Sequence, residues 1–251
     1  MARSGFKDHF SGASLDYQRS RPTYPEALFD FLAAQTPGHD MVWDCATGTG
    51  QAAQMLARYF DRVIATDGSA TQIANTVHDA RIDYRVATAE DSGIESRSAD
   101  LVTVAQALHW FDIPAFFAEV RRVLKPHGVI AIWSYNLLTI EPGIDAVINH
   151  LYGPVLDACW PPERKLVESD YRGIDFPFRT VATPLFAMEA YWTLDQLLAY
   201  LRTWSAVRRY QTEHGIDPVI ATAEALLPLW GDRHTRRTIR WPMPVRIGLN
   251  E

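Results

Sequence analysis

The chain has few of the residues that build disulfide frameworks and metal sites. Its 251 residues include two cysteines, Cys45 and Cys159, and this number excludes a framework of several disulfides. None of the eight histidines stands in an H-x-x-x-H or mixed His/Cys pattern, so we expect no bound metal. Cys45 lies inside a glycine-containing turn, where we expect a small buried residue rather than a nucleophile.

Long apolar runs and an excess of basic charge are also absent. The N-terminal segment MARSGFKDHFSG lacks the apolar core of a signal peptide, and no run approaches membrane-spanning length. The net charge of -6, from 24 basic and 30 acidic residues, gives no general attraction to nucleic acid or anionic membranes. A basic cluster at 233–240 is interpreted as a solvated turn before a strand. We therefore expect a soluble, cytoplasmic protein with a small-molecule partner and no nucleic-acid or membrane partner, whose oligomeric state stays open.

Short β-rich runs alternate with helical stretches along much of the chain. The composition, 47% apolar and 22% charged, is that of an ordinary globular protein, and the length suits a single domain. Helices are predicted at residues 51–60, 69–80 and 113–125, between the runs MVWD, RVIAT, RIDYRVA, ADLVTVAQA and GVIAIWSY. Asp112 is placed to cap the third helix. Alternation of this kind predicts an α/β fold with a doubly wound parallel sheet.

Two segments depart from this alternation. Residues 23–35 are predicted to form a helix before the first strand, with Thr23 and Glu26 spaced as a capping box and Pro25 in the first turn. Residues 136–178 are rich in proline and aromatic side chains and are too long for an ordinary connection. We interpret this second segment as a lid over the site.

The C-terminal part of the chain carries further helix and strand signals. A strand-like run at 179–188 leads to a helix whose start has the capping-box residues Thr193 and Gln196. Two prolines near the end exclude a central strand with a full ladder of hydrogen bonds. The following run, VRIGL at 245–249, suits a final antiparallel strand.

The stretch VWDCATGTGQAA, residues 42–53, predicts a strand, a glycine turn and a helix, an arrangement that binds nucleotides. Gly48 to Ala53 fits the G-x-G-x-x-G/A dinucleotide pattern, and Asp67 follows at about the expected 20 residues. Asp44, before the glycines, would repel a pyrophosphate and attract a cationic ligand. S-adenosylmethionine carries a sulfonium and an ammonium, so Asp44 favours that nucleotide. Asp67 is placed to accept ribose hydroxyls and is consistent with both nucleotides.

Four stretches, VWDCATGTGQ, VIATDGS, ATAEDSGIESRSADLVTVAQALHWFD and RRVLKPHG, resemble in this order the class I S-adenosylmethionine-dependent methyltransferases. The likeness spans roughly residues 42–133. It implies a Rossmann-like, mostly parallel seven-stranded sheet with an antiparallel C-terminal strand, with S-adenosyl-L-methionine as cofactor and S-adenosyl-L-homocysteine as product. A narrower resemblance, carried by YQRSRPTYP, AQALHWFD and LLAYLRTWSA, is to small-molecule methyltransferases related to trans-aconitate methyltransferase.

The resemblance also implies a division of the single domain and a set of cofactor contacts. The parts are an N-terminal arm and helix (1–38), a cofactor-binding core (41–135), the lid (136–178) and a C-terminal part of the sheet with helices (179–251). The implied cofactor-binding residues are Tyr17, Arg21, Asp44, Ala46, Gly48, Gly50, Asp67, Gly68, Thr88, Ala89, Glu90 and Gln106.

Three positions depart from the family pattern. Ala46 stands where the first glycine is usual, so the backbone there must tolerate a Cβ. Thr88 replaces the acid that often faces the adenine amino group, and His127 replaces a usual glycine. The arm that contains Tyr17 and Arg21 is expected to close over the cofactor, where an arginine fork suits a carboxylate. Ordinary surface ion pairs are the alternative for this arm.

His109, in the loop after the fourth strand, is the candidate catalytic residue. A hydroxyl, amine or carbon acceptor would use it as a base, whereas a carboxylate acceptor is already ionised and needs none. Orientation of the loop without proton transfer is the alternative role. The candidate substrate-binding residues are Trp110, Trp133, Tyr135 and Trp160, for which core packing is the alternative.

The sequence therefore favours a small-molecule methyltransferase, and O-methylation of a carboxylic acid is the expected reaction. Two other functions stay open. An NAD-dependent oxidoreductase conflicts with Asp44 and with the lack of a Tyr-x-x-x-Lys pair. A non-catalytic S-adenosylmethionine-binding module is compatible with the departures at Ala46 and Thr88.

Overall fold

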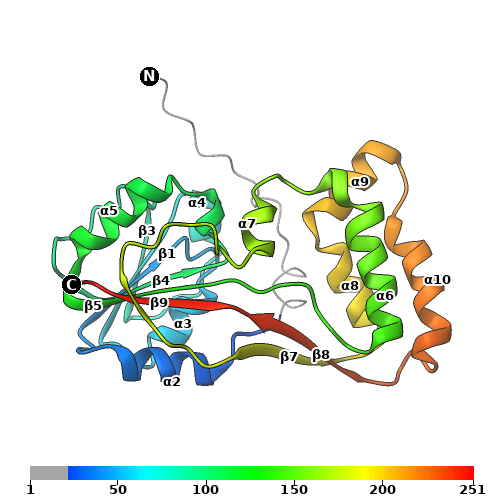
Figure 1. Cartoon of the computed structure of the whole chain (residues 1–251), viewed down its shortest axis with the longest axis horizontal. Coiled ribbons are helices and arrows are strands. Elements are labelled where there is room, and N and C mark those ends of the chain that lie inside the picture. The colour runs from blue at the N-terminus through cyan, green and yellow to red at the C-terminus, as the bar shows by residue number, and fades with distance from the viewer. Residues whose placement is uncertain (1–21) are drawn as a thin grey trace.

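The structure is a computed structural model that describes residues 22–251, and it contains an α/β core beside a group of helices (Figure 1). The core sheet has seven strands in the order β3-β2-β1-β4-β5-β9-β6. Its strands are β1 (Met41–Cys45), β2 (Arg62–Asp67), β3 (Ile82–Val86), β4 (Ala99–Ala105), β5 (Leu124–Trp133), β6 (Arg179–Val181) and β9 (Val245–Leu249).

The pairing of the strands confirms the predicted sheet. β1 pairs in parallel with β2 and β4, and the parallel set continues through β3 and β5. β9 runs antiparallel between β5 and β6, so the predicted final antiparallel strand is also confirmed. The chain order of the strands reverses between β1 and β4, and ligands of such sheets bind in the crevice beyond the carboxyl ends at this point.

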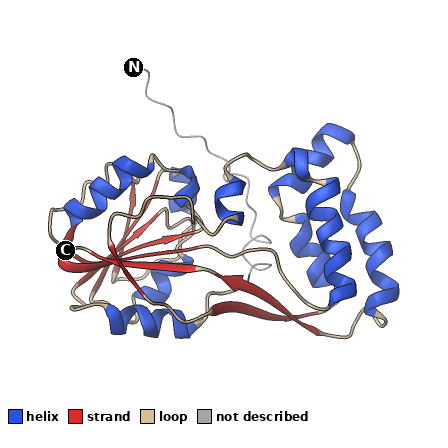
Figure 2. Cartoon of the chain, viewed as in Figure 1, coloured by secondary structure: helices blue, strands red, loops and turns tan. Residues whose placement is uncertain are grey.

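Helices cover both faces of the sheet (Figure 2). α2 (Glu26–Gln35) and α3 (Gln51–Leu56) pack on one face, and α5 (Ile113–Val123) packs on the other. Side chains of a strand alternate between faces, so Val42 of β1 joins the core under α2 and α3 while Trp43 joins the core under α5. Asp112 caps α5 as predicted, through Ala115 N–H at 3.3 Å.

A second group of helices lies beyond the end of β5, and we call it the helical body. It consists of α6 (Pro142–His150), α8 (Leu194–Arg202), α9 (Ser205–His214) and α10 (Pro218–Trp230). α6 and α8 both pack against α10, so the segment 136–178 shares one core with residues from much later in the chain. A two-stranded antiparallel sheet, β7 (Phe186–Trp192) with β8 (Arg237–Met243), leads to and from this body. The role of 136–178 as a lid stays a prediction.

Several local predictions are corrected. α2 begins after Pro25 without a side-chain cap, so the capping box of Thr23 and Glu26 is wrong; Glu26 pairs with Arg58 instead, at 2.6 Å. The helix predicted at 69–80 is the shorter α4 (Ala70–Ala74), because none of its residues is buried against the core.

Two more boundaries differ from the predictions. The helix predicted at 51–60 ends at Leu56, and the run 179–188 is divided between β6 and β7, which belong to different sheets. The capping box at the start of α8 is confirmed, with Thr193 N–H donating to Gln196 Oε1 at 3.0 Å. Within residues 22–251, no helix has the length and apolar character needed to cross a membrane.

Candidate active site

The glycine turn after β1 is built from left-handed backbone positions. Ala46, Gly48 and Gly50 have φ angles of 54°, 58° and 88°. Ala46 therefore occupies the family's glycine position in a conformation that L residues adopt at a cost of about 1–2 kcal/mol. His127, the other non-glycine departure, also lies in this region with φ 64°. The left-handed backbone at these two positions explains why the family usually has glycine there.

The two glycines of the turn have different surroundings. A Cβ added to Gly48 would meet no atom of residues 22–251 within 4 Å, so the described part of the chain leaves open space over this residue. A Cβ added to Gly50 would lie 2.4 Å from the hydroxyl of Tyr84 on β3. Gly50 is therefore required by packing, and Gly48 faces the space that a cofactor could fill.

Asp44 is buried at the end of β1 and binds two threonine hydroxyls. Thr47 Oγ1 donates to one carboxylate oxygen at 2.5 Å, and Thr103 Oγ1 donates to the other at 2.7 Å. Burial raises the pKa of Asp44 to about 6, and the two hydroxyls oppose this shift. Asp44 is thus ionised at neutral pH, and it acts on a ligand through its charge beneath the turn.

Asp67, at the end of β2, connects the glycine turn to the start of α4. Its carboxylate accepts hydrogen bonds from Gly48 N–H at 2.9 Å and Ser69 N–H at 2.8 Å. Gly68 lies between these contacts and is half-buried. Asp44 and Asp67 are close enough for the charge of one to raise the pKa of the other. Two neighbouring carboxylates fit a ligand with positive groups, as S-adenosylmethionine has, and do not fit a pyrophosphate.

The remaining predicted cofactor residues follow β3 and β4. Thr88 is exposed, Ala89 is buried, and Glu90 accepts a hydrogen bond from Asp112 N–H at 3.0 Å. Gln106 has a left-handed φ of 56°, and its side chain donates to the carbonyl oxygen of Tyr135 at 3.0 Å. The loops after β3, β4 and β5 are thereby connected, at the edge of the sheet that also holds Asp44 and Asp67.

Two predicted cofactor residues, Tyr17 and Arg21, lie outside the described residues. The segment that follows them crosses the start of α3, where Gln51 Nε2 donates to the carbonyl oxygen of Pro22 at 3.1 Å. Tyr24 packs edge-on against Trp133, with ring centroids 5.6 Å apart. The described part of the N-terminal segment therefore covers the glycine turn and the end of β5.

His109 is held by Tyr171, a residue that the sequence did not single out. His109 Nδ1 lies 2.9 Å from the Tyr171 hydroxyl, and the two rings are stacked. Burial, together with the positive charge of Arg164, lowers the pKa of His109 to about 4. Burial also raises the pKa of the Tyr171 phenol. His109 is therefore a neutral imidazole at physiological pH.

The candidate substrate-binding residues differ in burial and in their contacts. Trp133 is fully buried and packs against Tyr24 and Phe29, and its indole N–H has no partner among the described residues. Trp110 lies against the ring of His109, with centroids 4.6 Å apart. Tyr135 is half-buried and contributes its carbonyl oxygen to Gln106. The substrate contacts of these residues stay predictions.

Trp160 belongs to an aromatic cluster with a cation at its centre. It packs with Tyr152 and Trp204, and its indole N–H donates to the carbonyl oxygen of Tyr152 at 2.9 Å. The guanidinium of Arg164, in α7 (Arg164–Glu168), stands 5.3 Å from the Trp160 ring centroid. The sequence indicated an aromatic segment here but gave no signal for Arg164, because its contacts with Tyr152 and Trp160 follow no recurring motif.

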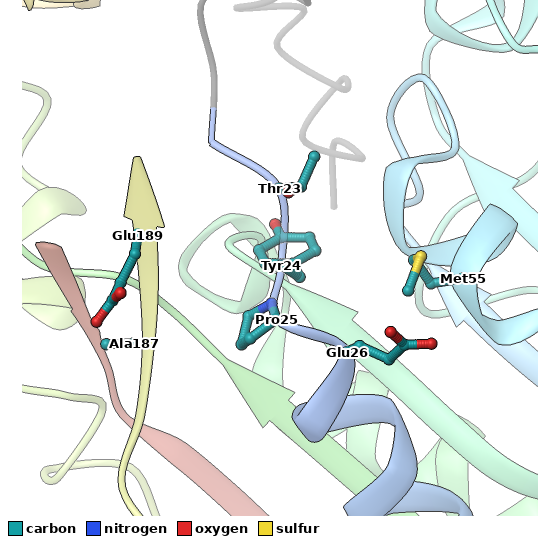
Figure 3. A pocket seen from close by; sticks show the side chains of 7 residues that line it. All are labelled: Thr23, Tyr24, Pro25, Glu26, Met55, Ala187 and Glu189. Atoms are coloured by element: carbon teal, nitrogen blue, oxygen red, sulfur yellow. The ribbon is translucent and has the colours of Figure 1, made fainter. Parts of the chain in front are cut away.

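Two cavities elsewhere on the chain lie apart from these residues. One, of about 500 Å³, is open between α3 and β7, and Figure 3 shows Met55 on one side, Glu189 on the other and the segment 23–26 between them. Its two carboxylates are already paired, Glu26 with Arg58 and Glu189 with Arg240. Another, of about 670 Å³, lies between α5 and residues 173–177. Of the predicted site residues within 22–251, none lines either cavity.

No group of three or more His, Cys, Asp or Glu side chains in the described part of the chain is arranged to hold a metal ion. The carboxylates of Asp44 and Asp67 instead bind hydroxyl and backbone N–H groups.

Comparison with known proteins identifies the family. The sequence matches the methyltransferase domain family over residues 43–132. A protein of Dictyostelium discoideum named as a methyltransferase is 33% identical over 226 residues, which are 88% of this chain and 86% of that protein. An uncharacterized methyltransferase of Mycobacterium tuberculosis is 34% identical over 229 residues, which are 86% of this chain and 87% of that protein.

A solved structure shares both the fold and the sequence pattern. A protein from Anaeromyxobacter dehalogenans, assigned as a type II methyltransferase, is 42% identical with a TM-score of 0.87. The match covers 92% of this chain and 98% of that one. The protein is therefore an enzyme and its cofactor is S-adenosyl-L-methionine, the nucleotide that Asp44 favoured over a dinucleotide. The chain belongs to the class I S-adenosylmethionine-dependent methyltransferases.

Proposed function

We propose that this enzyme transfers a methyl group to the carboxylate of a small organic acid. The observation that carries the proposal is the His109 imidazole itself, which lies 2.9 Å from the Tyr171 hydroxyl through Nδ1 and whose pKa is lowered by burial to about 4. A base with this pKa removes a proton poorly from an alcohol or an amine. A carboxylate is ionised at neutral pH and gives up no proton, so it suits a site whose histidine is a weak base.

The donor supplies a methyl group on a positively charged sulfur. An oxygen of the acceptor carboxylate forms a bond to the methyl carbon while the bond from carbon to sulfur breaks. The products are a methyl ester and S-adenosyl-L-homocysteine, and no proton is released. The protein contributes mainly by holding the two reactants aligned, which can supply about 7–11 kcal/mol in favourable systems.

The residues around the turn have separate roles in this proposal. Asp67 binds the ribose hydroxyls, and the charge of Asp44 favours the cationic donor over its neutral-sulfur product. Gly48 leaves room for the methionine part of the cofactor, because a Cβ there would meet none of the described residues within 4 Å. Thr88, Ala89 and Glu90 are proposed to contact the adenine. The family match and the position of these residues at one edge of the sheet support the assignment.

His109 is proposed to orient the acceptor as a hydrogen-bond donor. The Tyr171 phenol stays protonated because burial raises its pKa, and it can donate to Nδ1 of His109. A neutral imidazole that accepts at Nδ1 carries its proton on Nε2. That N–H can bind the carboxylate oxygen that does not attack.

The narrower likeness to the trans-aconitate methyltransferase-related group supports an acid acceptor of low molecular weight. We propose no nucleic-acid or membrane partner and a cytoplasmic location.

The test is a matched panel of acceptors with the purified enzyme and S-adenosylmethionine. Phenylacetate, hexanoate and decanoate are compared with the phenol, alcohol and amine of similar skeleton, and products are identified by mass spectrometry. The proposal predicts methyl esters from acids alone. Methyl ethers or N-methyl products, or no ester from any acid, would contradict it. The Asp67→Asn variant controls for methylation by a contaminating enzyme.

A further inference from the structure

Arg164 is held rigidly between the sheet and the helical body. It begins α7, which lies between these two parts of the molecule (Figure 1). Its guanidinium is 5.3 Å from the ring centroid of Trp160 and 5.6 Å from that of Tyr152. Arg164 Nε donates to the Tyr152 hydroxyl at 2.9 Å. Two rings and one hydrogen bond therefore fix the plane of the guanidinium.

Among the described residues, Arg164 forms no direct ion pair. Glu168, one turn further along α7, accepts a hydrogen bond from the same Tyr152 hydroxyl to which Arg164 Nε donates, so this carboxylate lies near the cation without contacting it. Other arginines of the C-terminal half are paired, for example Arg202 with Asp217 and Arg209 with Glu213, each at 2.8 Å. The terminal nitrogens of Arg164 have no hydrogen-bond partner within residues 22–251. The guanidinium is half-buried, and its terminal nitrogens are left as free donors by residues 22–251, so they can bind an anion.

The position of this cation relates it to the reaction. Its charge contributes to the low pKa of His109 and opposes the raised pKa of Tyr171, so the guanidinium lies within electrostatic reach of both rings. Trp160 and Tyr152 are half-buried and supply aromatic surface beside the guanidinium. The guanidinium of Arg164 and these two rings together suit an organic acid whose remaining part is apolar or aromatic.

We propose that Arg164 binds the carboxylate of the methyl acceptor, with the rings of Tyr152 and Trp160 against the apolar body of the same molecule. This inference rests on the proposed function and specifies its substrate class. The planar fork of arginine can hold both oxygens of a carboxylate. Each oxygen keeps further lone-pair capacity, so the anchored group can still attack the methyl carbon. The methionine end of the cofactor also carries a carboxylate that an arginine can bind. The test must therefore distinguish binding of the acceptor from binding of the cofactor.

The experiment measures acid binding without turnover, in the presence of S-adenosyl-L-homocysteine. Binding of phenylacetate and of the uncharged phenylacetamide is followed by tryptophan fluorescence, to which Trp160 contributes. The variants are Arg164→Met, which removes the charge, and Arg164→Lys, which keeps the charge without the fork. Arg209→Met is the matched control, because Arg209 is a paired arginine on the exposed face of α9.

Wild type and Arg209→Met are expected to bind phenylacetate at least tenfold more tightly than phenylacetamide. Arg164→Met is expected to lose this preference, and Arg164→Lys to keep part of it, which also shows that the site folds. Equal preference in Arg164→Met and wild type would overturn the proposal. Loss of S-adenosyl-L-homocysteine affinity with retained acid binding would also overturn it, by assigning Arg164 to the cofactor.

Ester formation separates this inference from the proposed function. If Arg164→Met forms methyl esters with unchanged KM, the anchor is refuted and the acid methyltransferase stands. If wild type forms no ester yet shows Arg164-dependent acid binding, the anchor stands and the proposed reaction fails.

Discussion

The glycine turn and the aromatic cluster around Arg164 differ in how their residues come together. In the turn, Asp44, Gly48 and Asp67 lie within one β-α-β unit and are connected by hydrogen bonds of 2.5–2.9 Å through Thr47 and backbone N–H groups. In the cluster, Tyr152 and Trp160 precede Arg164 by 12 and 4 residues in the chain, and Trp204 joins them from the start of α9. The turn follows a recurring motif that the sequence reveals, whereas the contacts of the cluster follow no such motif and require the fold.

The largest expected effect is on stability, and it differs between the two glycines of the turn. Gly50→Ala combines left-handed strain with a contact 2.4 Å from the Tyr84 hydroxyl, so the free energy of unfolding should fall by about 3–5 kcal/mol. Gly48→Ala adds strain alone and should cost about 1–2 kcal/mol while weakening cofactor binding. Denaturant unfolding measures both. Tyr84→Phe should recover part of the loss in Gly50→Ala, and equal losses in the two alanine variants would contradict this description of the turn.

A second prediction concerns acid stability and His109. Its pKa is about 4 in the folded protein and about 6.5 when unfolded, so the unfolded chain takes up the proton first as pH falls. Between pH 6.5 and 4, wild type should therefore lose up to about 3 kcal/mol of stability relative to His109→Asn. Burial raises the pKa of Asp44 to about 6, so protonation of Asp44 stabilises the folded state as pH falls below about 6. This contribution is the same in wild type and in His109→Asn.

The comparison between wild type and His109→Asn cancels the contribution of Asp44. Denaturant unfolding at several pH values measures the difference. Parallel stability curves for the two proteins would show that the imidazole is not buried as a neutral group. Tyr171→Phe is a useful companion, because it removes the hydroxyl at Nδ1 and keeps the ring stacked on His109.

A third prediction tests the charge of Asp44 beneath the turn. Asp44→Asn should weaken the binding of S-adenosylmethionine about tenfold and that of S-adenosyl-L-homocysteine less, because only the former carries a sulfonium. A unit charge at intermediate distance contributes about 1–2 kcal/mol to binding. Calorimetry at pH 8, well above the pKa of about 6, keeps wild-type Asp44 ionised. An equal loss for both ligands would assign Asp44 to the turn's structure alone.

The smallest effect is expected far from both regions. Thr193→Ala removes the capping box of α8 and should cost about 1 kcal/mol of unfolding free energy. Affinity for S-adenosyl-L-homocysteine should not change, since Thr193 lies outside the site. A change in that affinity would indicate that the helical body is coupled to the glycine turn.

The fold was predictable because its signals are local. The buried strands of the parallel sheet appear as apolar runs such as MVWD and GVIAIWSY, and Asp112 and Thr193 cap their helices as their neighbours indicate. The capping box at Thr23 failed because Pro25 precedes the helix and Glu26 is paired with Arg58 across 32 residues. A side chain with a distant partner does not follow a local rule.

The candidate site likewise contains residues that local spacing predicted and residues that it did not. The spacing of Gly48, Gly50 and Asp67 indicated a nucleotide turn, and Asp44 indicated which nucleotide. Tyr171 and Arg164 gave no comparable signal, since Tyr171 reaches His109 across 62 residues and the absence of a direct ion pair at an arginine depends on all of its neighbours.

One crossed binding measurement tests the separation of the two regions most directly. Calorimetry with S-adenosyl-L-homocysteine, followed by phenylacetate on the complex, is applied to wild type, Asp67→Asn and Arg164→Met. We predict that Asp67→Asn loses about 1.5–3 kcal/mol of nucleoside affinity, through its charged hydrogen bonds, and that Arg164→Met keeps this affinity but loses that for the acid. Loss of nucleoside binding in Arg164→Met, or full retention in Asp67→Asn, would contradict the account.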